Sequence, residues 1–552
     1  MLLLPVFWRR AALRGALGVV VAWLALVGAV DTAQAQAAAP ATPLPPEVET
    51  ALARARLPRE ALSVMVVDAQ GGKTSPARLA HRAQLPVNPA SVMKLVTTYA
   101  ALEQLGPAYV WNTPVYLQGT VQDGSLRGNV YIQGQGDPKL VMERLWLLMR
   151  RLQGQGIQVI VGDIVLDRTA FDLPEQDPAR FDGEPLRPYN AAPDALLLNF
   201  KSSVMTFVPD AAAGLARIQY DPPLAGVQRQ GSVPLAAPGA ECGDWRASLR
   251  AELSDPSRAG FQGVYPAACG ERVWPVAFAD PPGFAARAVE GMWREMGGKL
   301  TGSVRQGKVP AGLRPLFSTT SPPRAVVVRD VNKFSNNVMA QHVFLTLALQ
   351  KNGVATFDGA REVLRHWWQG RWGDVPMPVA DNGAGLSREA RISAQALGRM
   401  LQTAWTSPVM PELVASLPIV GVDGTLRRSK SRAGTAHLKT GSLRDVLAVA
   451  GYVHGASGRR YVLVAMVNHA AAAAARPALD ALADGEVPDL VFTDVRMPGM
   501  DGLAFLDALK AKRPGLPVIV MSAYTDVAST AGAFRGGAHE FLSKPFDLDE
   551  AV

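Results

Sequence analysis

Runs of apolar residues along the chain have two spacings, one typical of strands and one typical of helices. Residues 62–68 form a short apolar run that predicts a strand, and residues 92–102 carry apolar side chains at helical spacing soon after Pro89. Towards the other end, residues 438–446, 448–454 and 461–468 predict three neighbouring strands. The pattern predicts an α/β (α+β) protein in which helices pack on a sheet.

The middle of the chain is richer in strands. One strand each is expected at residues 128–133, 159–167 and 215–220, and helices are expected at 139–152 and 283–297. Further on, residues 330–349 predict one helix, and Ser393 is expected to cap the next. Residues 470–482 predict a closing helix, interrupted at Pro477.

Composition places the chain among ordinary globular proteins with several domains. It has 552 residues, of which 48% are hydrophobic and 19% charged. The formal net charge is +8, but no long lysine–arginine run and no nucleic-acid motif accompanies it. We therefore expect no nucleic-acid partner, and the charge suits an acidic cell-wall polymer.

The N-terminus has the pattern of a secretory signal peptide. Arg9, Arg10 and Arg14 precede the apolar stretch 15–30, and Ala33 and Ala35 form a small-residue cleavage signal. We expect residues 1–35 to be removed and the mature protein to be periplasmic, beginning with an Ala/Pro linker. The alternative is an uncleaved anchor, but the apolar stretch is short for a membrane span. Without it, membrane contact would be peripheral at most.

Two cysteines, Cys242 and Cys269, are present in the whole chain. In an exported protein such a pair is expected to form a disulfide, and the alternative is two buried thiols. Neither cysteine lies near a candidate catalytic motif in the sequence, so we assign them no chemistry.

Three short motifs carry the candidate chemistry. Ser91 and Lys94 are three residues apart on a predicted helix and so share one face, where a lysine kept neutral in a dry pocket can take the hydroxyl proton. Such an S-x-x-K match is weak alone. Ser335 and Asn337 supply an S-x-N, and residues 439–441 supply a K-T-G, in the order that penicilloyl serine transferases use.

The sequence around these motifs resembles that of the type-4 penicillin-binding proteins. The resemblance covers roughly residues 45–480 and is carried by residues 88–102, 381–387, 421–426 and 437–442. It implies a penicillin-binding/β-lactamase-like transpeptidase fold and an exported D-alanyl-D-alanine carboxypeptidase or endopeptidase. The carboxypeptidase would act on peptidoglycan stem peptides and be inhibited by β-lactam antibiotics.

Large inserts between the first two motifs are a mark of that family. Ser91 and Ser335 are roughly 240 residues apart, far more than a compact serine β-lactamase has. We therefore expect a β-rich insertion of one or two small domains at residues 115–315. The catalytic domain would consist of residues 36–114 and 316–482.

The resemblance also implies roles for the motif residues. Ser91 would attack the carbonyl between two D-alanines with Lys94 as base, and Ser335 would relay the proton to the leaving amine. Asn337 would bind a substrate amide. The terminal carboxylate would be held by the K-T-G segment, formed by Lys439, Thr440, Gly441 and Ser442. Neither a metal nor a cofactor is required.

One substrate contact and two alternative functions stay open. Asp137 lies in a turn that resembles a family turn facing the site, where it would pair with a stem-peptide amine; alternatively it caps the following helix. No E-x-x-L-N follows Asn337, so we expect slow release of a bound β-lactam. The alternatives are a β-lactamase or esterase of the same superfamily and a non-catalytic peptidoglycan-binding protein.

The last seventy residues resemble a different family from the rest of the chain. Residues 488–502, 516–523 and 541–546 resemble a response-regulator receiver of the nitrogen-regulator type, in which Asp494 matches the phosphoacceptor, Ser522 the switch hydroxyl and Lys544 the conserved lysine. The acidic pair that binds Mg²⁺ at the end of the first receiver strand is missing. We therefore expect residues 483–552 to be a partial flavodoxin-like fragment that is inactive in phosphotransfer.

Overall fold

The computed structural model describes residues 43–72, 75–455, 457–483, 491–494, 502–512, 518–522, 533–538 and 540–543. The predicted signal peptide and Lys544 lie outside these ranges. Within them, no helix combines the length and the apolar character that a bilayer-spanning segment requires.

A five-stranded antiparallel sheet forms the centre of the catalytic region, in the order β17-β18-β19-β1-β2. The strands are distant in sequence: β1 is Leu62–Asp68, β2 Leu79–His81, β17 Ala436–Leu443, β18 Val446–His454 and β19 Arg460–Asn468. The predicted strands 62–68, 438–446, 448–454 and 461–468 are confirmed, within a few residues at their ends.

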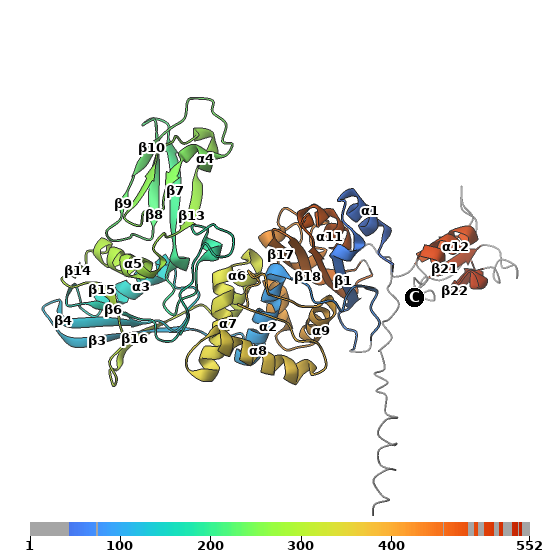
Figure 1. Ribbon diagram of the computed structural model, residues 1–552, viewed down its shortest axis with the longest axis horizontal. Coiled ribbons are helices and arrows are strands. Elements are labelled where there is room, and N and C mark those ends of the chain that lie inside the picture. The colour runs from blue at the N-terminus through green and yellow to red at the C-terminus, as the bar shows by residue number, and fades with distance from the viewer. Residues whose placement is uncertain are drawn as a thin grey trace, which may run out of the picture. The chain divides into compact units, whose positions relative to one another are not determined.

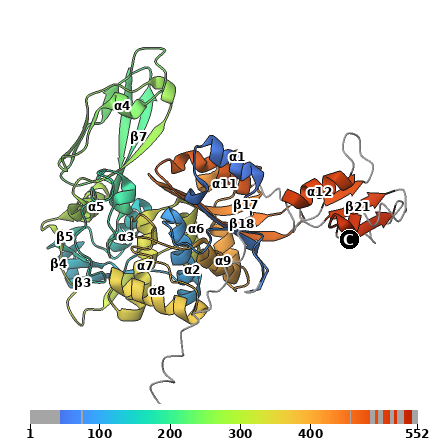
Figure 2. The same ribbon diagram turned by 45° about the vertical axis from the view of Figure 1, so that its right-hand side comes forward.

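The sheet is buried on both faces, which explains why its strands are continuously apolar. Along β19, Val462, Val464 and Met466 join one core cluster, whereas the alternate residues Leu463 and Ala465 join the other. Two helices, α1 (Pro46–Arg54) and α11 (Arg476–Ala483), cover the second face and lie against each other (Figures 1 and 2).

The other face carries the helices that hold the candidate site. They are α2 (Lys94–Leu105), α6 (Arg324–Phe334), α7 (Asn337–Asn352), α8 (Phe357–Trp372), α9 (Ala394–Trp405) and α10 (Met410–Ser416). The cap predicted at Ser393 is confirmed, because its side chain accepts a hydrogen bond from the Ala396 N–H.

Two helix predictions need correction. Residues 330–349 form two helices, not one, because the backbone of Ser335 is left-handed (φ 58°) and Asn336 caps a new helix by accepting from the Met339 N–H. The predicted interruption near Pro477 falls one residue earlier: a 3₁₀ turn, Ala472–Ala475, is followed by α11 from Arg476, so the proline occupies the first turn of α11, where its missing N–H costs nothing.

The chain between α2 and α6 forms two further groups of strands. The first is a seven-stranded sheet of β3 (Asn112–Gln122), β4 (Ser125–Gln133), β5 (Val159–Val161), β6 (Ile164–Asp167), β14 (Lys299–Leu300), β15 (Val304–Gln306) and β16 (Pro315–Thr320). Helices α3 (Met142–Gln153) and α5 (Pro281–Glu295) share its hydrophobic core (Figure 2). Residues 159–167, predicted as one strand, are two, because the chain breaks at Gly162 and Asp163.

The second group consists of two small sheets. One contains β7 (Ser202–Asp210), β8 (Leu215–Asp221), β10 (Ser232–Pro234) and β13 (Arg272–Ala277), and the other β9 (Gln228–Arg229), β11 (Ala251–Glu252) and β12 (Arg258–Phe261). The short helix α4 (Trp245–Leu249) lies here too. The predicted disulfide between Cys242 and Cys269 is formed.

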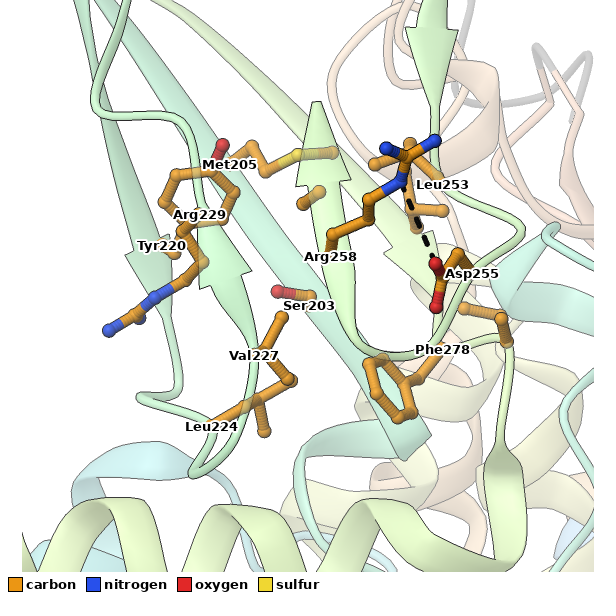
Figure 3. Close-up of a pocket in the computed structure, with 14 residues that line it drawn as sticks. Ser203, Met205, Tyr220, Leu224, Val227, Arg229, Leu253, Asp255, Arg258 and Phe278 are labelled. Atoms are coloured by element: carbon orange, nitrogen blue, oxygen red, sulfur yellow. Dashed lines mark ion pairs between the residues drawn. The ribbon is translucent and has the colours of Figure 1, made fainter. Parts of the chain in front are cut away.

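A cavity of about 40 Å³ lies between these sheets (Figure 3). Its lining is mainly apolar, with Met205, Val227 and Phe278 around the space and the ion pair of Arg258 with Asp255 beside it. This volume holds a few water molecules and no peptide. None of the predicted site residues lines it.

The described part of the C-terminal region contains three parallel strands in the order β20-β21-β22, with helix α12 (Gly502–Lys512). The strands are β20 (Val491–Asp494), β21 (Val518–Ser522) and β22 (Glu540–Ser543). Its small core includes Leu506, Val518 and Val520.

Candidate active site

Ser91 lies in a short 3₁₀ turn, Ala90–Met93, which leads directly into α2. The turn is tied down at its start: the Asn88 side chain accepts from the Ala90 N–H and donates to the Ser387 carbonyl. Ala90 adopts a left-handed backbone (φ 47°), a conformation that surrounding contacts must enforce in a residue with a Cβ. The hydroxyl of Ser91 is therefore held in place by its neighbours.

Lys94 is fully buried one turn after Ser91. Its Nζ lies 2.8 Å from Ser91 Oγ, 2.7 Å from Asn337 Oδ1 and 2.6 Å from the Ala384 carbonyl oxygen. Burial lowers the pKa of Lys94 far below its ordinary value, and the nearby charge of Lys439 lowers it further. Both effects favour the neutral form of the amine.

A neutral amine has two N–H donors and one lone pair. Asn337 Oδ1 and the Ala384 carbonyl can only accept hydrogen bonds, so these two contacts use both N–H groups of Lys94. In the neutral form the lone pair is then left for the third neighbour, Ser91 Oγ at 2.8 Å, which can donate its proton to it. This arrangement can remove the proton of the hydroxyl and make it a nucleophile.

The Asn337 side-chain amide is oriented from its other end as well. Its Nδ2 donates to the backbone carbonyl of Tyr189, in the inserted region, at 3.2 Å. With Nδ2 turned to Tyr189, Oδ1 must face Lys94, which fits the hydrogen bond found there.

The second lysine and the first S-x-N residue form a pair across the site. Lys439 is fully buried on β17, and its Nζ donates to Ser335 Oγ at 3.0 Å. Burial lowers the pKa of Lys439 to about 7, so small changes in its surroundings decide its charge. The left-handed backbone at Ser335, between α6 and α7, turns this hydroxyl towards the strand.

The K-T-G strand passes very close to the nucleophile turn. A Cβ at Gly441 would lie 2.6 Å from the Pro89 carbonyl oxygen and 3.1 Å from the Ser91 nitrogen, so a side chain there would force the two segments apart. Thr440 is partly buried and Ser442 is exposed. The three motifs predicted from sequence thus meet at one place.

Asp137 is placed differently from the prediction. It is buried, its carboxylate pairs with Arg144 at 2.6 Å, and it accepts from the Lys139 N–H. Burial raises its pKa, and Arg144 opposes that rise. The carboxylate is used inside the β4–α3 turn, which does not fit a contact with a stem-peptide amine; nor does it cap α3, whose cap residue is Val141.

The receiver-like residues lie at strand ends. Asp494 ends β20 and Ser522 ends β21, and the carboxyl ends of these parallel strands lie at the same edge of the sheet. Lys544 lies outside the described residues. Over the parts of the chain that the structure describes, no group of three or more His, Cys, Asp or Glu side chains is arranged to hold a metal.

Three contacts at the site were not anticipated from sequence. They are the Ala384 carbonyl on Lys94, the Tyr189 carbonyl on Asn337, and Thr425 Oγ1, which lies 2.8 Å from Thr440 Oγ1. Ala384 and Thr425 belong to segments 381–387 and 421–426, which the resemblance had already marked without roles. Tyr189 could not be recognised from its residue type, because its backbone oxygen makes the contact.

A hydroxyl activated by a buried lysine, on a helical turn beside a five-stranded antiparallel sheet, defines a serine peptidase with the penicillin-binding transpeptidase fold. Comparison with known families agrees: the sequence model of the D-Ala-D-Ala carboxypeptidase 3 (S13) family matches residues 44–486. The chain belongs to this family.

Individual relatives support the same placement. The chain is 26% identical over 462 residues to a D-alanyl-D-alanine carboxypeptidase of Actinomadura sp. (strain R39), covering 79% of this chain and 83% of that protein. Among solved structures, penicillin binding protein 4 (dacB) from Haemophilus influenzae has a TM-score of 0.62 at 22% identity, covering 79% of this chain and 99% of that one. A second structure of that protein holds a β-lactam.

The C-terminal region matches the response regulator receiver domain over residues 461–552. It is 51% identical over 74 residues to the DNA-binding transcriptional regulator NtrC of Escherichia coli (strain K12), covering 13% of this chain and 16% of NtrC. The two family matches overlap over residues 461–486, which include most of β19, and β19 pairs with β1 and β18 in the peptidase sheet. That strand is therefore not available to the sheet of β20, β21 and β22.

Proposed function

We propose that the protein is an exported D-Ala-D-Ala carboxypeptidase that forms an acyl-enzyme at Ser91. Cross-linked stem peptides, which contain a related peptide bond, are proposed as a second substrate of the same site. The observation that carries this proposal is the fully buried Lys94, whose Nζ lies 2.8 Å from Ser91 Oγ and whose pKa is lowered by burial and by the charge of Lys439. Family membership supports the choice of substrate.

In the acylation step, Ser91 Oγ forms a bond to the carbonyl carbon between the two D-alanines while its proton moves to Lys94 Nζ. The backbone N–H groups of Ser91 and Ser442 are proposed to hold the resulting oxyanion, where one such donor contributes roughly 3 kcal/mol. The carbon–nitrogen bond then breaks, and the proton reaches the leaving D-alanine amine through Ser335, whose hydroxyl contacts Lys439.

The free carboxylate of the substrate is proposed to bind beside Lys439 and the hydroxyls of Thr440 and Ser442. Because the pKa of Lys439 lies near 7 in the empty site, an arriving carboxylate would favour its charged form. Water then attacks the acyl carbonyl and releases the shortened peptide, which restores the Ser91 hydroxyl.

Two further properties belong to this proposal. A β-lactam would acylate Ser91 and leave slowly, which is consistent with the β-lactam complex of the Haemophilus influenzae relative. Export to the periplasm is supported by the sequence of residues 1–35 and by the Cys242–Cys269 disulfide, since disulfides persist in oxidising compartments. Fractionation of cells that produce the full chain would locate it.

Release of D-alanine from a peptide ending in D-Ala-D-Ala tests the activity. We expect release by the wild type, none by Ser91→Ala, and normal release by Ser457→Ala, which removes an exposed hairpin hydroxyl as a control. Release that continues in a folded Ser91→Ala variant would refute the assignment of the nucleophile. A folded wild type that neither releases D-alanine from linear peptides nor separates the two stems of a cross-linked peptide would refute the proposed function.

A further inference from the structure

We propose that Thr425 is a positioning residue that orients the Thr440 hydroxyl and thereby sets the preference of the site for a substrate with a free C-terminal carboxylate. This inference rests on the proposed function, in which Thr440 binds that carboxylate. Thr425 lies outside the three motifs, in a short 3₁₀ turn, Gly424–Leu426, beside β17.

The contact that carries the inference is direct. Thr425 Oγ1 lies 2.8 Å from Thr440 Oγ1, and either oxygen has the geometry to donate. Thr440 follows Lys439 on β17, and Lys439 Nζ also contacts the Thr440 carbonyl oxygen at 2.6 Å. Thr425 is exposed and Thr440 is partly so, which leaves this pair of hydroxyls open to a ligand.

Once a carboxylate is bound, the available donors and acceptors determine which of the two threonine hydroxyls donates to the other. A carboxylate only accepts, so Thr440 must use its single O–H to donate to it. The Thr440 oxygen then has only lone pairs to offer Thr425, so Thr425 must be the donor between the two hydroxyls. Thr425 therefore fixes the Thr440 rotor with its proton directed away from Thr425 and free for the substrate.

The turn that carries Thr425 is fastened to the S-x-N segment. Asp423 accepts from Lys333 Nζ at 2.6 Å and from the Ile419 N–H at 2.8 Å. Although burial alone would raise it, these hydrogen bonds hold the pKa of Asp423 below its usual value, so the carboxylate stays charged. Lys333 is 3% exposed and lies two residues before Ser335.

Close packing keeps the turn at a fixed distance from α6. Gly424 has a left-handed backbone (φ 55°), and a Cβ there would lie 2.6 Å from the Lys333 carbonyl oxygen. The turn is thus held both by an ion pair and by direct backbone contact. A hydroxyl presented from such a support has little freedom to turn away from Thr440.

The test compares two peptides that differ only at the C-terminus, one ending in a free D-Ala-D-Ala carboxylate and one in the corresponding amide. The measured quantity is the ratio of kcat/KM for the free acid to kcat/KM for the amide. We expect Thr425→Val to lower this ratio about two- to tenfold, which is the effect of losing one hydrogen bond. The loss should arise from a higher KM for the free acid. Thr425→Ser, which keeps the donor, should restore it.

Two controls separate a positioning role from others. Thr435→Val removes another exposed threonine hydroxyl near β17, one that bonds the Arg432 carbonyl, and should leave the ratio unchanged. In a Thr440→Val background, Thr425→Val should have no further effect, because its hydrogen-bond partner is gone.

An unchanged ratio in Thr425→Val overturns the inference. So does an effect of Thr425→Val that persists in the Thr440→Val background, since Thr425 would then act on the carboxylate directly or through the fold. If the wild type releases no D-alanine from the free acid, the proposed function itself fails, and the inference fails with it.

Discussion

The close approach of the K-T-G strand to the nucleophile turn predicts a large effect from one added methyl group. In Gly441→Ala, the new Cβ would lie 2.6 Å from the Pro89 carbonyl oxygen, whereas ordinary contact begins at 3.4 Å. The strand or the turn must therefore move by about 0.8 Å. Displacements near 1 Å cost roughly a hundredfold in rate, so we expect acylation of Ser91 to slow by roughly ten- to a hundredfold.

The stability of this variant should change much less than its activity. Overpacking costs about 1–3 kcal/mol, and the loss of glycine's freedom in the unfolded chain offsets about 0.4–1 kcal/mol of that. We expect Tm to fall by a few degrees while the chain stays folded.

The assay is the rate of labelling by a fluorescent penicillin, measured together with thermal unfolding. Gly370→Ala is the matched control, because a Cβ at that helical position meets nothing within 4 Å. It should leave acylation unchanged and, if anything, raise Tm. If Gly441→Ala is acylated at the wild-type rate and its Tm is unchanged, the close contact between the two segments is refuted.

Three further predictions follow from the same structure. Lys439→Met should raise the pKa of Lys94 by removing the neighbouring cation, so the pH midpoint of acylation should move up; an unmoved or lower midpoint would contradict the coupling of the two lysines. Burial holds the pKa of His342 at about 4, against about 6.5 when unfolded, so the unfolded chain binds the extra proton and unfolding free energy should fall as pH falls from about 6.5 to 4. In His342→Gln, denaturant titrations should show a flatter pH dependence over that window, and an equally steep one would assign it to other groups. Replacing both Cys242 and Cys269 by serine opens a loop with a sequence separation of 27 and should destabilise the small β-sheets by about 3–4 kcal/mol, leaving penicillin labelling at 25 °C unchanged; loss of labelling in a folded variant would tie these sheets to the site.

Sequence patterns anticipated the sheet and the three motifs because both depend on local spacing. The apolar runs of β1, β18 and β19 and the three-residue spacing of Ser91 and Lys94 are visible in single segments. The break at Ser335 was missed, since its neighbours have helical spacing and the capping by Asn336 is a local alternative to a continuous helix.

The contacts made by backbone carbonyls and by distant loops were not predictable in this way. The Ala384 carbonyl meets Lys94 across 290 positions of sequence, and any residue type provides such an oxygen. Asp137 shows the converse: its turn was recognised, but whether the carboxylate faced a ligand or Arg144 depended on the packing of α3. The sequence identifies candidate groups, and the tertiary fold decides which of them meet.

We expect Ser91 to be the group that becomes acylated, with Lys94 taking its proton. Intact-mass measurement after incubation with benzylpenicillin, followed by peptide mapping, identifies the acylated residue. We expect one penicilloyl adduct, long-lived and confined to the peptide that contains Ser91, and no adduct on Ser91→Ala. An adduct on another residue, or none on the folded wild type, would contradict it.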